Sequence, residues 1–232
     1  MSEKEKVLTL RVLLILLVFI VGVPMLPLLI SWDWAWWEAW TYAGVNFLGF
    51  VISRVLASRK HPDLIVERGK FFRHDNPEVW DKTLSPLVGL AGGLIPLVAG
   101  LDARFGISIS FPLWVRLAAL GLLIAGYVLG SYALITNRYF SGMVRIQSDR
   151  GHQVVNSGPY RWMRHPGYAG SLLSYLATPF LLESLWTFTP VVLISAILVL
   201  RTALEDRTLQ KKLEGYREYT NEVHYRLIPG IW

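Results

Sequence analysis

Residues 158–200 read GPYRWMRHPGYAGSLLSYLATPFLLESLWTFTPVVLISAILVL, a short basic turn followed by two apolar runs. The runs cover 168–182 and 185–200 and are separated by only two residues. Each is shorter than the roughly 20 apolar residues that a helix needs to cross a bilayer. This pattern predicts a tight helical hairpin, with Pro179 and Pro190 as the positions that kink its arms.

The composition of the whole chain indicates a membrane protein. Of its 232 residues, 53% are hydrophobic and only 17% are charged, and the mean hydropathy is +0.40. A typical soluble domain has about 25% charged residues. The chain has no cysteine, which excludes disulfides, thiolate nucleophiles and cysteine-ligated zinc. We expect no metal site.

Further apolar runs precede the hairpin, at residues 12–30, 39–56, 84–101 and 113–135. The first should be a retained span, because no small-residue cleavage site follows it and it exceeds a signal-peptide core of roughly 7–15 residues. Pro24 and Pro27 are expected to kink its far end. The prediction is an all-α, polytopic integral membrane protein with about six hydrophobic helices.

A single membrane domain is expected over residues 1–232, with N-terminal spans in 1–110 and a catalytic core in 111–232. The tail from Arg201 is predicted to be a cytoplasmic amphipathic helix. Its apolar face would carry residues at helical spacing, namely Leu209, Leu213, Tyr216 and Thr220.

The distribution of basic residues predicts the orientation in the membrane. Lysine and arginine number three before the first span, seven around the loop after the second, five in the loop after the fourth and six in the tail. The opposite side has only Arg104 and Arg116. Both termini and the basic turn should therefore be cytoplasmic. Because the basic residues are spread over several loops, the net charge of +6 does not indicate a nucleic-acid partner.

Residues 31–40 read SWDWAWWEAW and contain five tryptophans. They could form an aromatic cage for a choline-type cation. An interfacial belt at the end of a span is the favoured interpretation, because it needs no ligand.

Two segments could carry chemistry. In the turn 158–170, prolines stiffen the backbone, glycines allow close approach to a ligand, and His165 and Tyr168 offer hydrogen-bonding groups. In RTALED, Arg201 and Glu205 share one helix face at the end of the last apolar run. The alternatives are an interfacial loop and a juxtamembrane ion pair of little energetic worth.

Three stretches together resemble the isoprenylcysteine carboxyl methyltransferase family: HQVVNSGPYRWMRHPGYAG at 152–170, RTALED at 201–206 and YREYTNEVHYRLIP at 216–229. That family in turn resembles the phospholipid N-methyltransferases. The resemblance covers residues 130–230, whereas the first 110 residues match only as generic spans.

The resemblance implies S-adenosylmethionine as cofactor, with a cytoplasmic pocket that includes His152, Tyr160, His165, Tyr168 and Gly170. Glu205 and Asp206 take the place of a paired-glutamate motif that contacts the cofactor or orders the site. Arg201 matches an arginine that would orient a substrate carboxylate, so Arg201 and Glu205 are the expected catalytic residues. The aspartate at 206 departs from the family pattern and shortens the reach of that side chain.

The methyl acceptor stays open, as a lipidic or small molecule. A carboxylate acceptor is already ionised near pH 7 and needs no base. An amine or thiol would need one, and Glu205 is the nearest candidate. The alternatives to a methyltransferase are an NADPH-dependent enzyme similar to the sterol reductases, which share this kind of C-terminal half, and a membrane scaffold without catalysis. No obligate protein partner is evident.

Overall fold

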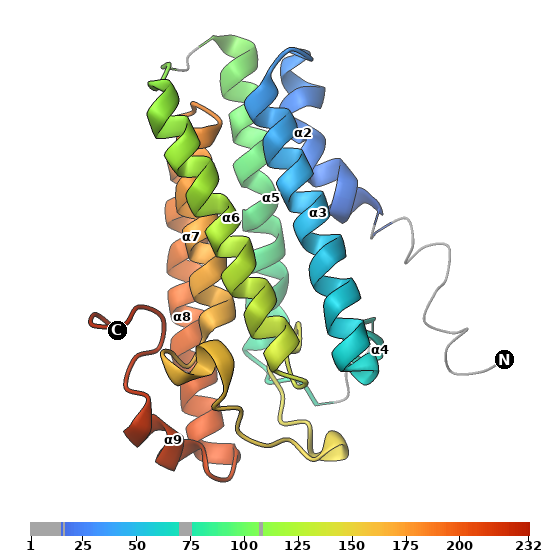
Figure 1. Cartoon of the computed structure of the whole chain (residues 1–232), viewed down its shortest axis with the longest axis vertical. Helices are drawn as coiled ribbons and strands as arrows, with labels where there is room; N and C mark the ends of the chain where they lie inside the picture. Colours follow the sequence, from blue (N-terminus) through green and yellow to red (C-terminus); the bar gives the residue numbers. More distant parts are fainter. Residues whose placement is uncertain (1–14, 16, 70–75, 107–108) are drawn as a thin grey trace, which may run out of the picture.

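The computed structural model of the chain describes residues 15, 17–69, 76–106 and 109–232, and these form helices and loops without a strand. The long helices lie side by side in one bundle (Figure 1). Among the described residues, three helices have the length and hydropathy of membrane spans: α5 (Asp81–Phe105), α6 (Leu113–Thr136) and α8 (Phe188–Lys212). The predicted all-α architecture is confirmed, and the other predicted spans form helices that are shorter or more polar.

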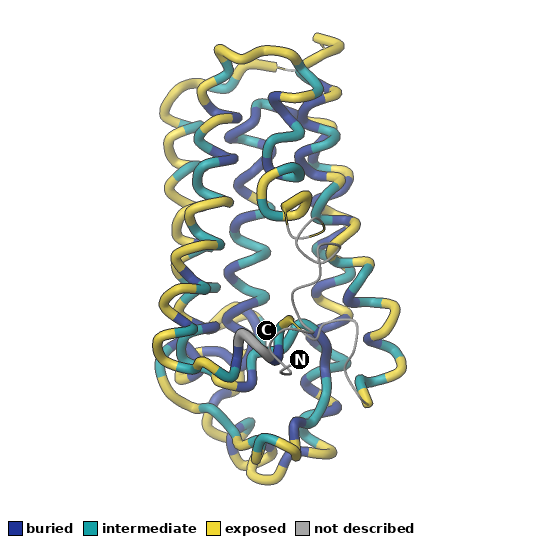
Figure 2. The backbone as a smooth tube through the Cα atoms, turned by 90° about the vertical axis from the view of Figure 1, so that its right-hand side faces the viewer, coloured by how far each residue is buried: buried dark blue, intermediate teal, exposed yellow. Residues whose placement is uncertain are grey.

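The outward faces of the long helices are apolar. Leu90 is 64% exposed, Val128 63% and Val192 67%. In Figure 2 the exposed positions lie on the outer sides of the helices and the buried positions face the inside of the bundle. A soluble protein rarely exposes contiguous apolar surface of this extent. Such apolar faces are stable in contact with the lipid of a bilayer, so the chain is an integral membrane protein.

The N-terminal part contains η1 (Val18–Gly22), α2 (Val23–Ser31) and α3 (Trp37–Lys60). Residues 12–14 and 16 of the first predicted span lie outside the described residues. The second predicted span forms α3, which extends beyond it at both ends. A short further helix, α4 (Pro62–Gly69), lies in the polar stretch that follows.

The C-terminal hairpin is present. It consists of α7 (Pro166–Leu181) and α8, which run in opposite directions (Figure 1). Pro179 lies in the last turn of α7. Pro190 lies in the first turn of α8, where a missing N–H removes no intrahelical hydrogen bond.

Glycines bring α6 and α7 into close contact. A Cβ atom on Gly170 would lie 2.5 Å from the Gly126 carbonyl oxygen and 2.8 Å from the Gly130 nitrogen. A Cβ on Gly126 would lie 2.5 Å from the Gly170 carbonyl oxygen. Small residues allow helix backbones in membranes to approach in this way. The contact fixes the start of α7, and with it the basic turn, against the end of α6.

The tail differs from its prediction. No new helix begins at Arg201, because α8 continues unbroken to Lys212. The chain then turns at Gly215, whose φ is +75°, and forms the short α9 (Tyr216–Glu222). The turn changes the helical register, so Tyr219 is buried where the prediction had Thr220. The apolar tail residues form a cluster with two loop residues, comprising Leu209, Leu213, Tyr216, Tyr219, Val223, Ile146 and Val154.

Candidate active site

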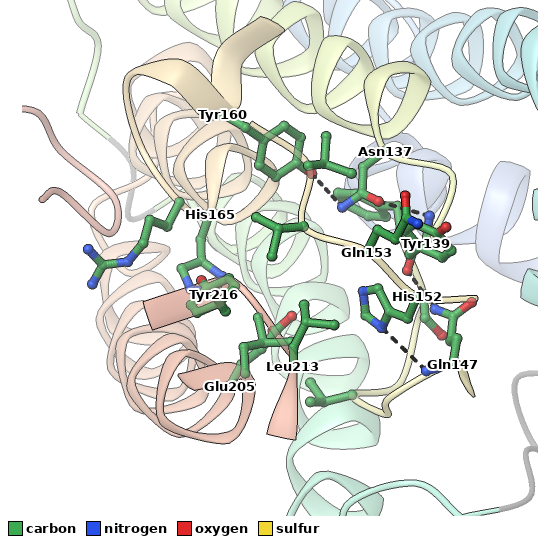
Figure 3. Close-up of a pocket in the computed structure, with 18 of the residues that line it drawn as sticks. Asn137, Tyr139, Gln147, His152, Gln153, Tyr160, His165, Glu205, Leu213 and Tyr216 are labelled. Atoms are coloured by element: carbon green, nitrogen blue, oxygen red, sulfur yellow. Dashed lines mark hydrogen bonds between the residues drawn. The ribbon is translucent and has the colours of Figure 1, made fainter. Parts of the chain in front are cut away.

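A polar pocket lies at the end of the bundle where the loop 137–165, the start of α7, the second half of α8 and α9 meet (Figure 3). Its cavity volume is about 100 Å³, and the pocket is partly open to solvent. Five of the predicted site residues line it: His152, Tyr160, His165, Tyr168 and Glu205. Their sequence separations reach more than fifty residues, so only the folded bundle brings them together.

His152 lies on the loop side of the pocket, beside Tyr139 and Gln147 (Figure 3). Its ring centroid is 4.5 Å from that of Tyr139, and its Nδ1 accepts a hydrogen bond from the Gln147 backbone N–H at 3.3 Å. Burial, together with the positive charges of Arg145 and Arg150, lowers the pKa of His152 to about 4. At neutral pH the pocket therefore contains an uncharged imidazole at this position.

Glu205 lies on the opposite wall, on α8 (Figure 3). Its Oε2 accepts a hydrogen bond from the Tyr168 hydroxyl at 2.6 Å. The ring of Tyr168 stacks on that of His165, with centroids 5.9 Å apart and an interplanar angle of 11°. The start of α7 thus orients a carboxylate of α8 at the pocket.

Tyr160 belongs to the 3-10 helix η3 (Gly158–Arg161) and is buried. Its hydroxyl oxygen lies 3.3 Å from the Asn137 amide nitrogen, which donates to it. Its backbone carbonyl accepts a hydrogen bond from the Tyr219 hydroxyl at 2.6 Å. Tyr160 therefore joins the basic turn to the end of α6 and to α9.

Arg201 does not line the pocket. Its Nε and Nη2 donate to the two carboxylate oxygens of Asp81 at 2.7 and 2.9 Å, and Nη2 also donates to the Gly142 carbonyl at 2.8 Å. Both side chains are buried. Asp81 also accepts a hydrogen bond from the Val144 backbone N–H at 2.6 Å. The substrate-carboxylate role expected for Arg201 stays a prediction, and Asp81 competes for the same guanidinium.

Asp206 is also turned away from the pocket and is fully buried. Its carboxylate accepts hydrogen bonds from Arg164 at 2.7 and 3.0 Å and from Arg226 at 2.9 Å. Tyr216 and Gln210 donate to it at 3.2 and 2.8 Å, and the His165 Nε2 lies 3.4 Å away. Asp206 ties the basic turn and the tail to α8. A contact between Asp206 and a cofactor stays a prediction.

Gly170, the remaining predicted residue, lies in the α6–α7 contact and borders a second cavity rather than the polar pocket. The sequence pattern indicated no role for Arg164, although this residue stands in the quoted turn. Besides pairing with Asp206, this arginine donates to the backbone carbonyls of Val223 and His224 at 2.7 and 2.9 Å. In the sequence, the only signal for a link between the basic turn and the tail was the resemblance of residues 216–229 to the family.

The pocket combines aromatic rings, a neutral imidazole and one carboxylate that is not ion-paired within the part of the chain that the structure describes. Rings suit a planar base, and a carboxylate suits a cation. No group of three or more metal-ligating side chains occurs among the described residues.

Fold and site together define the class of protein: a helical integral membrane protein with a polar pocket at one end of its bundle. Within that class, residues 119–211 match the model of the isoprenylcysteine carboxyl methyltransferase (ICMT) family. This segment, less than half of the chain, is similar to that family.

Curated relatives match part of the chain. A probable protein-S-isoprenylcysteine O-methyltransferase of Oryza sativa subsp. indica is 31% identical over 114 residues, which are 48% of this chain and 60% of the rice protein. The Delta(14)-sterol reductase TM7SF2 of Mus musculus is 36% identical over 95 residues, which are 40% of this chain and 23% of the mouse protein. The chain therefore spans less than two thirds of the length of each of these relatives.

A solved structure of the eukaryotic intramembrane Ras methyltransferase ICMT shares the fold. It superposes with a TM-score of 0.51 at 20% sequence identity, over 99% of this chain and 89% of that one. The likeness extends over the N-terminal helices, for which the sequence alone indicated only generic spans.

Proposed function

We propose that this protein is an S-adenosylmethionine-dependent membrane methyltransferase. One observation carries the proposal. Within the segment that matches the family, the Tyr168 hydroxyl holds the Glu205 carboxylate at the wall of a polar, aromatic pocket. The cofactor supplies an electrophilic methyl group on a positively charged sulfonium. The residues at this pocket have the chemistry to hold it.

The side chains of the chain would act by positioning and by charge. The Glu205 carboxylate favours a cation nearby, and its partial burial strengthens that attraction relative to bulk water. Tyr168 restricts the carboxylate to one orientation. His152, uncharged at neutral pH, adds no repulsion to a cationic ligand. Tyr139 and Tyr216 present rings against which a planar base can pack. In-line displacements depend mostly on such positioning.

We propose a carboxylate on an apolar carrier as the methyl acceptor, the class that the description of the matching family names. A carboxylate is ionised at neutral pH and requires no base, so Glu205 is free to act on the cofactor. An amine or thiol acceptor would require a base and would give Glu205 a second task. We further propose that residues 111–232 form the catalytic core and that the pocket and both termini are cytoplasmic.

The second candidate is an NADPH-dependent reductase, because the mouse sterol reductase is also a relative. Calorimetry on the purified protein separates the two. S-adenosylhomocysteine should bind, and NADPH should bind far more weakly or not at all. A tighter dissociation constant for NADPH would refute the methyltransferase proposal, and binding of neither would support a scaffold.

A further inference from the structure

A second cavity of about 400 Å³ lies between α3, α6 and α7, next to η1. Much of its lining is apolar or small, including Phe19, Ile20, Phe50, Leu134 and Gly130. Its lining within α6 comes from the half of that helix nearest the polar pocket. The cavity therefore lies inside the membrane bundle and suits an apolar chain.

Two arginines also line this cavity, Arg54 of α3 and Arg68 of α4. Arg54 donates to the Ser53 hydroxyl at 3.1 Å and stacks over Phe50 at 4.5 Å. Arg68 donates to the Phe140 carbonyl at 3.3 Å. Both are partly buried, and the cavity lining in the described part of the chain contains no aspartate or glutamate.

This lack of a counter-ion distinguishes them from the arginines around the polar pocket. Arg145, Arg150, Arg164 and Arg201 each pair with a carboxylate of the chain. Across the described residues, Arg54 and Arg68 have none within 4.0 Å. Burial and the positive charges of Arg54 and Arg201 lower the pKa of Arg68 to about 9, which still leaves it protonated at pH 7. Two partly buried positive charges that lack a carboxylate partner among the described residues favour an anion.

The second cavity adjoins the polar pocket. Phe140 and Gly167 line both, and a Cβ on Gly167 would lie 2.6 Å from the Phe140 ring. The Arg68 guanidinium carbon is 5.5 Å from the centroid of that ring. An anion held by Arg68 would therefore lie at the partition between the two spaces, where a group passing from one ligand to the other must cross.

We propose that Arg54 and Arg68 bind the carboxylate of an amphiphilic methyl acceptor whose apolar chain occupies the second cavity. The inference rests on the proposed methyltransferase function and adds the residues that recognise the acceptor. Arg201 already pairs with Asp81, so among the described residues Arg54 and Arg68 are the arginines that line the second cavity without a carboxylate partner.

The charge balance of the transfer agrees with this assignment. A carboxylate oxygen forms a bond to the methyl carbon while the bond between that carbon and the sulfur breaks, and its electron pair stays on the sulfur. No proton moves. The acceptor changes from an anion to a neutral ester, which the arginines no longer attract. The same two charges that bind the acceptor would thus favour release of the product.

The test measures binding to purified protein in detergent, without cofactor, using N-acetyl-S-farnesylcysteine as the probe and its methyl ester as the neutral counterpart. The acid should bind the wild type at least about tenfold more tightly than the ester, as expected for a charge-assisted hydrogen bond. Arg54→Gln and Arg68→Gln should each remove most of this preference. Arg59→Gln, an exposed position on the same helix, is the matched control and should preserve it.

Equal binding of acid and ester by the wild type would overturn the inference without any variant, so it stays testable even if the variants fold poorly. Retention of the preference in Arg54→Gln and Arg68→Gln would also overturn it. Tighter binding of farnesyl phosphate than of the acid would assign the cavity to a phosphate headgroup instead.

Arginine-dependent binding with no methyl transfer would refute the proposed function and leave the anion site standing. Methyl transfer with an unchanged KM for the acceptor in both variants would refute the anion site and leave the proposed methyltransferase function standing.

Discussion

Arg201 forms a bidentate, buried ion pair with Asp81, a residue 120 positions earlier in the chain. The pair joins the middle of α8 to the start of α5. It therefore links the proposed catalytic core to the N-terminal part of the chain. Neither residue lines the polar pocket.

Asp81→Asn should destabilise the protein by about 3–5 kcal/mol, because it leaves a buried guanidinium without its counter-charge. Thermal unfolding in detergent measures the effect. Arg201→Lys keeps the charge but loses the planar fork, so it should also destabilise. If Arg201 binds a substrate carboxylate, Arg201→Lys should in addition abolish turnover at temperatures where it is still folded, with cofactor binding intact. Turnover near the wild-type rate in the folded variant would limit Arg201 to a structural role.

Glu205→Gln should weaken binding of S-adenosylmethionine about tenfold, as expected for loss of a charge-assisted contact, and should affect S-adenosylhomocysteine much less, because that compound has no sulfonium charge. Tyr168→Phe, which removes the hydroxyl but keeps the carboxylate, is the control and should lower both affinities to a similar, smaller degree. Calorimetry measures the dissociation constants of both compounds for the wild type and for each variant. An equal loss for the two ligands in Glu205→Gln would show that the carboxylate does not act on the sulfonium.

Gly170→Ala should destabilise the protein by about 1–3 kcal/mol, because the added methyl group overlaps backbone atoms of Gly126 and Gly130. Gly121→Ala is the matched control. It is an exposed glycine of α6 with nothing within 4 Å of its added Cβ, so helix propensity should make it neutral or stabilising. The measurement is the melting temperature of each variant relative to the wild type. A Gly170→Ala variant as stable as the wild type would contradict the close α6–α7 contact.

His152 should make the stability of the protein depend on pH. Its pKa falls from 6.5 in the unfolded chain to about 4 in the folded one. Between these values the unfolded state binds more protons, so stability is present above pH 6.5 and is lost as the pH falls toward 4. In His152→Gln the slope of melting temperature against pH in this window should be shallower. Superimposable slopes for the variant and the wild type would argue against a buried neutral imidazole.

The two ends of the bundle should lie on opposite sides of the membrane. A reporter fused after Trp232 should register the cytoplasm, because the end that carries the polar pocket also carries most of the arginines around it. A reporter inserted in the loop between α5 and α6 should register the other side. The same compartment for both reporters would contradict the proposed orientation.

Much of the fold could be predicted from the sequence. Apolar runs indicated where the helices lie, because hydropathy and helical length are local properties that a bilayer selects directly. The hairpin after the basic turn and the all-α class followed from them. The tail was predicted less well. Helical spacing was extended across Gly215, where a left-handed turn changes the register and buries Tyr219 in place of Thr220.

Within the candidate site, the sequence alone identified the residue types and the segments that bear them: the basic turn, His152 and Glu205. Only the tertiary structure decided which of the charged residues are free to meet a ligand. It paired Arg201 with Asp81 and enclosed Asp206 among Arg164 and Arg226. It left Arg54 and Arg68 at a cavity whose described lining contains no carboxylate. The physical reason is that an ion pair depends on distance in space, and no local pattern records which charges a bundle brings within 4 Å of one another.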